Sequence, residues 1–414
     1  MNANLYKAGD FMKGLVLEGG GTKGAYQIGA YKALRDLGIE FQGVTGTSIG
    51  ALNGAYIIQN DIEVMEDIWL TYDYTHFMNI DEETYEKYKN VDFTAKNINT
   101  VIGLINKARK NEGIDISPLR ELIQKTLSED KLRQSNKDFG LVTVYWDKKI
   151  NPHPLYLEDI PNGRLVDYLI ASSSLPIFNL DRIDDKLFLD GMFFDNMPIS
   201  LLEQKGYDDI VVIRLLDDFL GKMNLNKHQN INVKTIVPSE YLGGSLNKDK
   251  DNVLKNINLG YLDAMKAYDR YDGIKYYFNV DYRFDEDYCF EKFKNMKKET
   301  IENLLSLFNI KRDANLRTLL EVLIPKLGEI LGLDKDFSYK DLFYGIYEKK
   351  LEENNINRVK LYDFNKLYDV VNKNISENKN IYLAYEQKSI IPVQKNKIIK
   401  VCTNNIINDF SNQF

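Results

Sequence analysis

Short apolar runs alternate with amphipathic stretches through the first half of the chain. Residues 14–18 and 41–46 form apolar runs of strand length, and each is followed by residues with helical spacing, at 25–38 and 49–58. Further strand-like runs lie at 141–146, 154–160, 186–191 and 209–216, with helical patterns at 164–174 and 199–206. This alternation predicts an α/β fold in which a mainly parallel central sheet is covered by helices on both faces, in three layers.

The pattern changes after about residue 290, where helical stretches follow one another in a background rich in Lys and Asn. We expect a core over 13–215, an extension packed on it over 216–290, and a helix-rich C-terminal region over 291–414 of unassigned role. Apolar residues within 304–307 and 316–333 are numerous enough for a homodimer face or a membrane-touching face. We favour packing on the first half of the chain, because most apolar helix stripes belong to a core.

Composition limits the classes of protein that fit. Hydrophobic residues make up 44% and charged residues 28% of the 414 residues, as in soluble globular proteins. The net charge of −7 argues against a globally basic surface for nucleic acid. Two cysteines, Cys289 and Cys402, are too few for a disulfide framework. With no apolar run of signal-peptide length near the start and none long enough to span a bilayer, we expect a cytoplasmic protein that contacts membranes only peripherally.

A glycine-rich loop follows the first predicted strand. Gly19, Gly20, Gly21 and Gly24 lie between that strand and the first helix. Two kinds of site use such a loop. One is the G-x-G-x-x-G loop that holds the pyrophosphate of a dinucleotide, and the other presents backbone N–H groups to the oxyanion formed in acyl transfer.

The second strand-to-helix junction carries G-x-S-x-G, spelled by Gly46, Thr47, Ser48, Ile49 and Gly50. A nucleophile elbow holds its serine on a strained turn of this kind, and the flanking glycines are needed for lack of space. The helix that follows places its positive end near developing negative charge. The alternative is a tight turn in which the serine caps the helix.

The two junctions together favour acyl transfer over dinucleotide binding. A dinucleotide site needs an acidic residue at the end of the second strand, to hold the ribose hydroxyls. Glu40 precedes that strand, and the expected position is occupied by Gly46, Thr47 and Ser48. Both junctions lie at the carboxyl edge of the predicted sheet, where the glycine loop can face the serine.

A nucleophilic serine needs a base, and Asp190 is the better candidate. It follows a short apolar strand, and Gly191 allows a sharp turn directly after it. Asp195 is a rival in the same loop. The chain order Ser48, Asp190, His228 leaves a Ser-Asp-His hydrolase open, but His228, like His76 and His153, lies in an irregular segment without a motif. No Cys/His cluster suggests a metal, so we expect neither a metal nor a cofactor.

Four motifs in this order resemble those of the patatin-like phospholipases, in particular bacterial patatin-like acyl hydrolases. They are the glycine loop, the G-x-S-x-G elbow, the block Ala171–Pro176 and Asp190-Gly191, and the resemblance spans about 13–215. It implies a patatin-like fold and a Ser-Asp dyad without histidine, with Ser48 as nucleophile and Asp190 as base. It also implies an oxyanion hole made by the loop Gly19, Gly20, Gly21, Thr22, Lys23 and Gly24.

The activity implied by the resemblance is hydrolysis of phospholipid acyl esters or related lipids through an acyl-enzyme. The family has Gly or Ala after Asp-Gly, whereas this chain has Met192, which either narrows the pocket or packs outward. A catalytically impaired relative that binds lipid or serves as a scaffold is therefore an alternative, as are the Ser-Asp-His hydrolase and the dinucleotide-binding protein. Residues 60–135 and the C-terminal helices are candidates for a lid, a membrane-contact surface or a regulatory module.

Overall fold

The computed structural model describes residues 12–93, 113–147, 149–180, 182–216, 225, 228, 230–377 and 393–413. The chain divides into two compact units, residues 1–267 and 268–414. The extension expected over 216–290 crosses this division, so that its first part belongs to the first unit and its last part to the second. Residues 94–112, a part of the segment 60–135 considered for a lid, a membrane-contact surface or a regulatory module, lie outside the described residues.

The first unit is built on an eight-stranded sheet with the order β5-β6-β3-β2-β1-β7-β8, and β4 pairs with β3 beside this path. The strands β1, β2, β3, β7 and β8 are parallel to one another, whereas β4 and β6 run antiparallel to β3. The strands span Lys13–Leu17 (β1), Gly43–Thr47 (β2), Asp138–Asp147 (β3), Lys149–Tyr156 (β4), Arg182–Ile183 (β5), Lys186–Asp190 (β6), Asp209–Ile213 (β7) and Asn232–Ile236 (β8).

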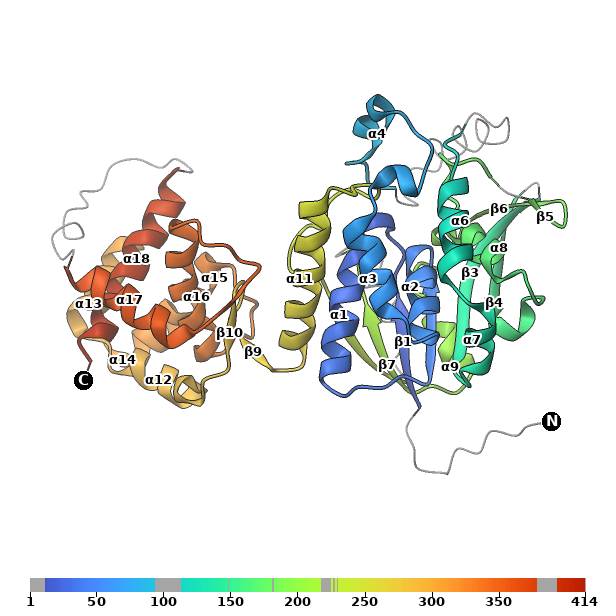
Figure 1. Ribbon diagram of the computed structural model, residues 1–414. Helices are drawn as coiled ribbons and strands as arrows, with labels where there is room; N and C mark the ends of the chain where they lie inside the picture. Colours follow the sequence, from blue (N-terminus) through green and yellow to red (C-terminus); the bar gives the residue numbers. More distant parts are fainter. Residues whose placement is uncertain are drawn as a thin grey trace. The chain divides into compact units, whose positions relative to one another are not determined.

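Helices cover both faces of this sheet, which confirms the predicted α/β/α layers (Figure 1). Val16 packs with residues of α9 on one face, and the Leu17 side of the sheet is covered by α2. The helices of the unit span Ala25–Asp36 (α1), Ile49–Ile58 (α2), Ile62–Thr71 (α3), Glu82–Tyr88 (α4), Ser117–Thr126 (α6), Glu129–Gln134 (α7), Leu165–Ser172 (α8), Ile199–Gln204 (α9) and Lys250–Ala267 (α11).

Two strands share one edge of β3, and this arrangement positions the site. β4 pairs with residues 140–147 of β3, while β2 pairs with 138–142 and β6 with 143–146. Because β4 occupies one edge throughout, β2 and β6 must both lie along the other edge. β2 runs parallel to β3 and β6 runs antiparallel to it, so the two strands point toward each other and their carboxyl ends meet.

Most predicted elements of the core are confirmed, one differs, and the strands β5 and β8 and the helix α11 were not predicted. The strand predicted at 154–160 is the end of β4, which forms a hairpin with β3 and stops at Tyr156. Pro152 and Pro154 interrupt the apolar pattern of β4, which hides its beginning in the sequence. The helix α11 received no prediction, because its polar face carries many Asn and Lys residues.

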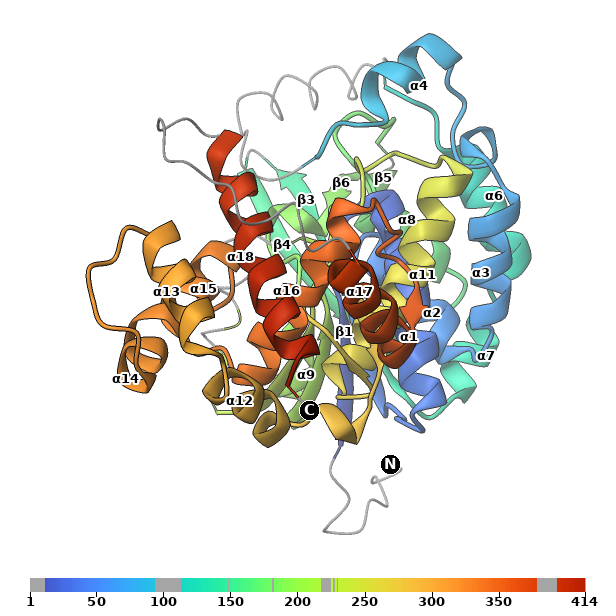
Figure 2. The same cartoon turned by 90° about the vertical axis from the view of Figure 1, so that its left-hand side faces the viewer.

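The second unit is helical around a small three-stranded sheet. Its helix α16 contacts α12, α15, α17 and α18, and these helices can be followed in Figure 2. The unit comprises β9 (Tyr271–Asp272), β10 (Tyr277–Asn279), α12 (Glu286–Lys294), α13 (Lys298–Leu307), α14 (Leu316–Thr318), α15 (Ile324–Leu331), α16 (Tyr339–Glu353), β11 (Leu361–Tyr362), α17 (Phe364–Glu377) and α18 (Val393–Ser411).

The leucines considered for a dimer or membrane face contribute to the core of this second unit. Leu304, Leu319, Leu323 and Leu327 are buried among the aromatic residues of that core. They were predicted to pack on the first half of the chain, and the structure corrects this: the helical region is long enough to bury them in a core of its own.

The helices α1 and α11 approach each other through reciprocal glycines, which yields a stability prediction. A Cβ at Gly29 would lie 1.8 Å from the carbonyl oxygen of Ile257, and one at Gly260 would lie 2.0 Å from that of Tyr26. We expect Gly29→Ala to destabilise the first unit by about 1–3 kcal/mol, because the helices must separate. Thermal unfolding measures the loss. Gly345→Ala on α16 is the control, since its nearest neighbour would be 3.6 Å away, and an unchanged Tm for Gly29→Ala would contradict the close approach.

Candidate active site

Ser48 and Asp190 meet where β2 and β6 end. Thr47, the last residue of β2, pairs with Val142, and Asp190, the last residue of β6, pairs with the adjacent Thr143. The Ser48 hydroxyl donates a hydrogen bond of 2.7 Å to Oδ2 of Asp190. The two residues are 142 positions apart in the chain, and the shared edge of β3 brings them together.

The backbone at Ser48 is strained, as a nucleophile elbow requires. Its φ of 57° and ψ of −127° lie in a region that L-residues rarely adopt. A Cβ at Gly46 would lie 2.4 Å from the carbonyl carbon of Gly50, and one at Gly50 would lie 2.1 Å from the carbonyl oxygen of Leu17. The flanking glycines are therefore required by the close approach of the backbone. Thr47 donates its hydroxyl to the carbonyl oxygen of Asp195 at 2.8 Å and anchors the turn.

The strained turn is also held by Ser172, a residue of the Ala171–Pro176 block to which the sequence assigned no individual role. The Ser48 N–H donates to Oγ of Ser172 at 2.9 Å, and this hydroxyl donates to the carbonyl oxygen of Val142 at 2.7 Å. Because Val142 pairs with the end of β2, the three residues form a closed network around the elbow. The buried N–H of Ser48 thus has a hydrogen-bond acceptor.

Asp190 is a buried carboxyl group with few compensating partners. It is 0% exposed, and Oδ1 accepts the N–H of Met192 at 2.9 Å. Burial raises the pKa of Asp190 from 3.8 to about 7, while the bonds from Met192 and Ser48 act in the opposite direction. A carboxylate with this pKa is a much stronger base than an exposed aspartate, and a substantial fraction of it is ionised at neutral pH.

A close approach of the backbone also restricts the residue that follows Asp190. A Cβ at Gly191 would lie 2.1 Å from the carbonyl oxygen of Val142, so glycine is required there. Met192 contributes its backbone N–H to Asp190, and this bond is independent of the side chain. Met192 is half-buried and is not among the described residues that line the cavity beside Ser48. A narrowing of that cavity by Met192 is therefore not observed.

The glycine loop passes close to Ser48, and its N–H groups differ in their partners. The N–H of Gly19 donates to the carbonyl oxygen of Asn196 at 3.2 Å, and that of Thr22 to the carbonyl oxygen of Ser245 at 2.9 Å. Within the described part of the chain, no acceptor is observed for the N–H groups of Gly20 and Gly21. These two amides are therefore available to a ligand. Gly24 lies further along, against Ile49, where a Cβ would approach Cγ1 to 2.4 Å.

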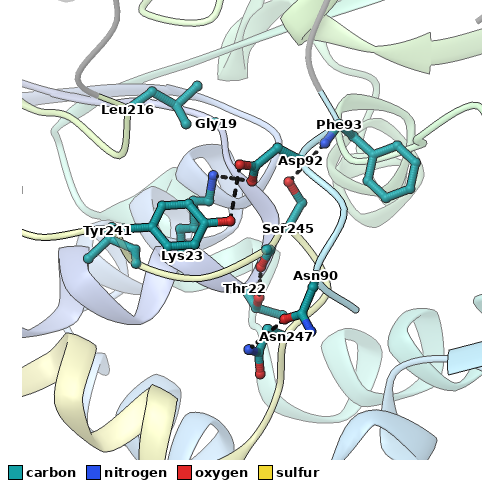
Figure 3. Close-up of polar contacts among 12 residues, drawn as sticks. Gly19, Thr22, Lys23, Asn90, Asp92, Phe93, Leu216, Tyr241, Ser245 and Asn247 are labelled. Carbon is teal, nitrogen blue, oxygen red and sulfur yellow. Dashed lines mark hydrogen bonds and ion pairs between the residues drawn. The ribbon is translucent and has the colours of Figure 1, made fainter. Parts of the chain in front are cut away.

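The side chain of Lys23, another residue of the loop, forms an ion pair. Its side chain is 2% exposed, and Nζ lies 2.6 Å from Oδ1 of Asp92. Tyr241 donates its hydroxyl to the other oxygen of Asp92 at 3.1 Å, and its ring lies 5.7 Å from the Lys23 ammonium (Figure 3). The Lys23 ammonium is therefore paired with Asp92, which belongs to the segment considered from the sequence for a lid, a membrane-contact surface or a regulatory module.

Two further segments cover the glycine loop and fix it in place (Figure 3). The hydroxyl of Thr22 donates to the carbonyl oxygen of Gly244 at 3.1 Å, next to the bond between Thr22 and Ser245. Ser245 in turn donates its N–H to Val91 at 3.0 Å, and its hydroxyl accepts the N–H of Phe93 at 3.2 Å. The contacts of these segments with the glycine loop were not predicted from the sequence. The glycine pair Gly243-Gly244 was the one sequence feature that indicates a close approach of two backbone segments there.

An apolar cavity opens beside Ser48. Ile49, Leu52 and Tyr56 line it from one face of α2, and residues of α3 and α6 complete its walls. The described lining residues are Gly21, Thr22, Ser48, Ile49, Leu52, Tyr56, Met65, Ile68, Trp69, Tyr74, Phe77, Met78, Leu119, Leu122, Ile123, Ser173, Leu175, Phe178, Ser245, Leu246 and Lys248. The cavity is thus suited to a hydrocarbon chain whose polar end lies at the serine.

The three histidines have partners elsewhere. His228 lies with Nδ1 2.8 Å from Oε2 of Glu203, and His76 lies with Nδ1 2.9 Å from Oδ1 of Asp73. His153 contacts the ring of Tyr168, and burial lowers its pKa. The rival base Asp195 accepts the N–H of Met197 at 3.0 Å. Of these candidates and Asp190, the structure brings only Asp190 into hydrogen-bond contact with Ser48.

The described residues contain neither a metal-binding cluster nor a helix suited to span a membrane. No cluster of three or more His, Cys, Asp or Glu side chains is arranged to hold a metal ion among them. None of the described helices combines the length and the apolar character needed to cross a bilayer.

Part of the first unit matches a known protein family. Residues 15–202 match the family model described as patatin-like phospholipase. The chain is 57% identical over 42 residues to lysophospholipase nte1 of Aspergillus terreus, covering 10% of this chain and 3% of that protein. It is 28% identical over 217 residues to the neuropathy target esterase sws of Drosophila melanogaster, covering 48% of this chain and 12% of that protein.

A solved structure is similar over a larger part of the chain. The crystal structure of VipD from Legionella pneumophila matches with a TM-score of 0.40 and 14% identity, covering 95% of this chain and 83% of that one. The matches to the curated relatives are confined to a small part of those proteins, at most about an eighth of the two described above.

The burial of Asp190 predicts a pH-dependent stability effect. Because its pKa is raised to about 7, the stability contributed by its neutral form is lost as pH rises from about 4 to about 7. We therefore expect Asp190→Asn to stabilise the first unit by up to about 4 kcal/mol at pH 8, and by much less at pH 5. Thermal unfolding of both proteins across this range measures the difference, and a difference independent of pH would contradict the assignment.

Proposed function

From the patatin-like phospholipase domain that residues 15–202 carry, we propose that this chain is a serine acyl hydrolase acting on phospholipids or related acyl lipids. The observation that carries the proposal is the 2.7 Å hydrogen bond between the Ser48 hydroxyl and Asp190, formed at a strained elbow. A hydroxyl bound directly to a carboxylate of raised pKa has its base in place. No histidine is needed for the proton transfer.

The proposed reaction proceeds through an acyl-enzyme. Asp190 accepts the proton of Ser48 as Oγ attacks the ester carbonyl carbon, and a tetrahedral intermediate forms. The carbon–oxygen bond of the ester then breaks, and the proton passes from Asp190 to the departing alcohol. A water molecule, deprotonated by Asp190, attacks the acyl carbon, and the fatty acid leaves with the proton returned to Ser48.

The negative charge of the intermediate would be bound by the glycine loop. The N–H groups of Gly20 and Gly21 are available for it, while those of Gly19 and Thr22 are held by carbonyl oxygens. Each donor of this type typically contributes about 10²–10³ in rate. The N-terminus of α2, directly after Ser48, adds the positive end of its dipole. The contacts of Thr22 and Lys23 then hold the loop in position rather than bind the oxyanion.

The cavity beside Ser48 supports a fatty-acyl substrate. Its walls from α2, α3 and α6 are almost entirely apolar, so the acyl chain would lie there with its carboxyl carbon at the serine. One similar protein is named a lysophospholipase, which fits a phospholipase A-type carboxylic ester hydrolase. In this proposal the catalytic core comprises about residues 13–215, joined by the segment around Ser245 that covers the glycine loop.

Labelling with a fluorophosphonate ester tests the nucleophile and its base. We expect wild type, Asp195→Asn and His228→Ala to be labelled, and Ser48→Ala and Asp190→Asn to be unlabelled. Release of fatty acid from phospholipid micelles should follow the same order, with Asp190→Asn slowed by about 10²–10⁴-fold because general base catalysis is lost.

The control variants separate the alternatives. Asp195→Asn changes the other aspartate of the same loop, and loss of labelling in His228→Ala would favour the Ser-Asp-His hydrolase. Labelling that persists in Ser48→Ala contradicts the nucleophile. A wild type that binds phospholipid but neither reacts with the probe nor releases fatty acid would favour the catalytically impaired lipid-binding relative.

Exposed aromatic residues near the site support peripheral membrane contact. Phe194 is 55% exposed four residues after Asp190, and Tyr241 is 65% exposed beside Lys23. Large apolar side chains at such exposure are suited to insertion into a lipid surface. In our proposal this edge of the first unit faces the membrane, where the substrate is found.

A charge at Phe194 tests the membrane contact. We expect Phe194→Asp to lower hydrolysis of phospholipid vesicles by about 10-fold, because an apolar anchor is lost. Hydrolysis of a water-soluble short-chain ester should be unchanged. Val64→Asp is the control, since Val64 lies exposed in the first turn of α3, away from the carboxyl edge of the sheet. Equal losses on both substrates would contradict a membrane role for Phe194.

A further inference from the structure

The cavity beside Ser48 contains a charge that acyl binding does not require. Of its described lining residues, Lys248 alone is charged, and the rest are apolar, aromatic, glycine or hydroxyl residues. Lys248 is only 6% exposed. Burial of an ammonium group is costly unless the group is paired, so its presence in this cavity needs an explanation.

The ammonium of Lys248 is held by neutral groups. Nζ donates to the carbonyl oxygens of Trp69 and Tyr72, each at 2.6 Å. It also lies 5.2 Å from the ring centroids of Trp69 and Phe77. Within the described part of the chain, no carboxylate forms an ion pair with it, and Asp73 acts only from a distance. Burial lowers the pKa of Lys248 to about 8, so the group is mainly protonated at neutral pH.

A purely structural role accounts for two of the three donors. The carbonyl oxygens of Trp69 and Tyr72 lie at the C-terminal end of α3, where a cation is favourable. The Lys248 backbone is fixed as well, because its N–H donates to the hydroxyl of Tyr85 at 3.0 Å. An ammonium has three N–H bonds. Among the described residues no third acceptor is observed for Nζ, so one N–H and a charge without a carboxylate partner are available to an anion.

A second hollow lies on the other side of Lys248. It is lined by residues from the end of α3, from α4 and from the segment after Lys248, and it shares Trp69, Tyr74 and Lys248 with the apolar cavity. Its charged residues besides Lys248 are Lys250 and the carboxylates Asp73, Glu82, Glu86 and Asp249, so a headgroup there would meet a mainly acidic surface. Lys248 therefore stands between a compartment suited to hydrocarbon and one suited to a polar group. In a lysophospholipid, the phosphate follows the ester-bearing glycerol and separates the acyl chain from the polar headgroup.

We propose that Lys248 is a specificity-determining residue that binds the phosphate of a phospholipid substrate while its acyl ester lies at Ser48. The inference rests on the proposed function, because the phosphate is placed relative to an ester bound at the serine. The acyl chain then fills the apolar cavity, and the remainder of the headgroup extends into the polar hollow. A charge-assisted hydrogen bond to phosphate compensates for the desolvation of the ammonium.

Two substrates with the same acyl chain test the proposal, one a lysophospholipid and the other a monoacylglycerol without phosphate. We expect Lys248→Met to raise KM for the lysophospholipid by about 10- to 100-fold, as for loss of a hydrogen bond between charged groups. KM for the monoacylglycerol and kcat for both should remain within about twofold of wild type. Lys248→Arg should retain most of the preference, because the cation is kept.

Controls separate this role from a structural one. Other residues of α6 line the same cavity, whereas Lys125 on this helix is exposed and does not line it. Lys125→Met should therefore leave both KM values unchanged. Equal KM increases for both substrates in Lys248→Met, or a lower kcat for both, would mean that Lys248 only caps α3. Equal KM values for the two substrates in wild type would also overturn the inference, although hydrolysis of the monoacylglycerol would leave the proposed function intact.

Equilibrium binding gives a readout that needs no turnover. An ether-linked lysophospholipid, which cannot be hydrolysed, should bind Ser48→Ala about 10- to 100-fold more tightly than it binds the Ser48→Ala, Lys248→Met double variant. Inorganic phosphate at the same concentration should not bind measurably, because it lacks the acyl chain. Tight binding of inorganic phosphate alone would assign Lys248 to a free-phosphate site, and equal binding of the ether lipid by both proteins would reject the phosphate contact.

Discussion

The structure of the site depends on a single edge of β3. β2 and β6 approach along that edge from opposite directions, and their ends place the Ser48 hydroxyl 2.7 Å from Asp190. A parallel sheet alone would not achieve this, because its strands end side by side and not end to end. The antiparallel insertion of β6 therefore decides the geometry. Ser172 and the backbone of Val142 then hold the strained elbow by hydrogen bonds across the same strand.

Burial gives the site its chemical character, with opposite effects on two groups. It raises the pKa of Asp190 to about 7, which makes the carboxylate basic, and lowers that of Lys248 to about 8. Each group loses hydration on folding and retains only part of it through hydrogen bonds. Such costs are expected where stability is given up for reactivity or recognition.

The glycine loop is a supported element whose shape depends on distant segments. Thr22 forms hydrogen bonds with Gly244 and Ser245, and Ser245 forms hydrogen bonds with Val91 and Phe93. Lys23 adds an ion pair to Asp92. These contacts occupy the groups around Gly20 and Gly21 and leave the two amides without an observed acceptor within the described residues. Segments from beyond the strand–helix core thus determine which N–H groups of the loop are available in our proposal for the oxyanion.

The sequence by itself determined the layered α/β core and, through the glycines around Ser48 and Asp190, where the chain turns too tightly for other residues. Such signals are local, because periodicity and steric limits act over a few neighbouring residues. Met192 was expected from the sequence either to narrow the pocket or to pack outward, and its side chain is not among the described residues that line the cavity. The partner of Lys23, the role of Ser172 and the burial of Lys248 were decided only by the tertiary structure. They join segments far apart in the chain, and the contacts that fix them arise only once the strands and helices have packed.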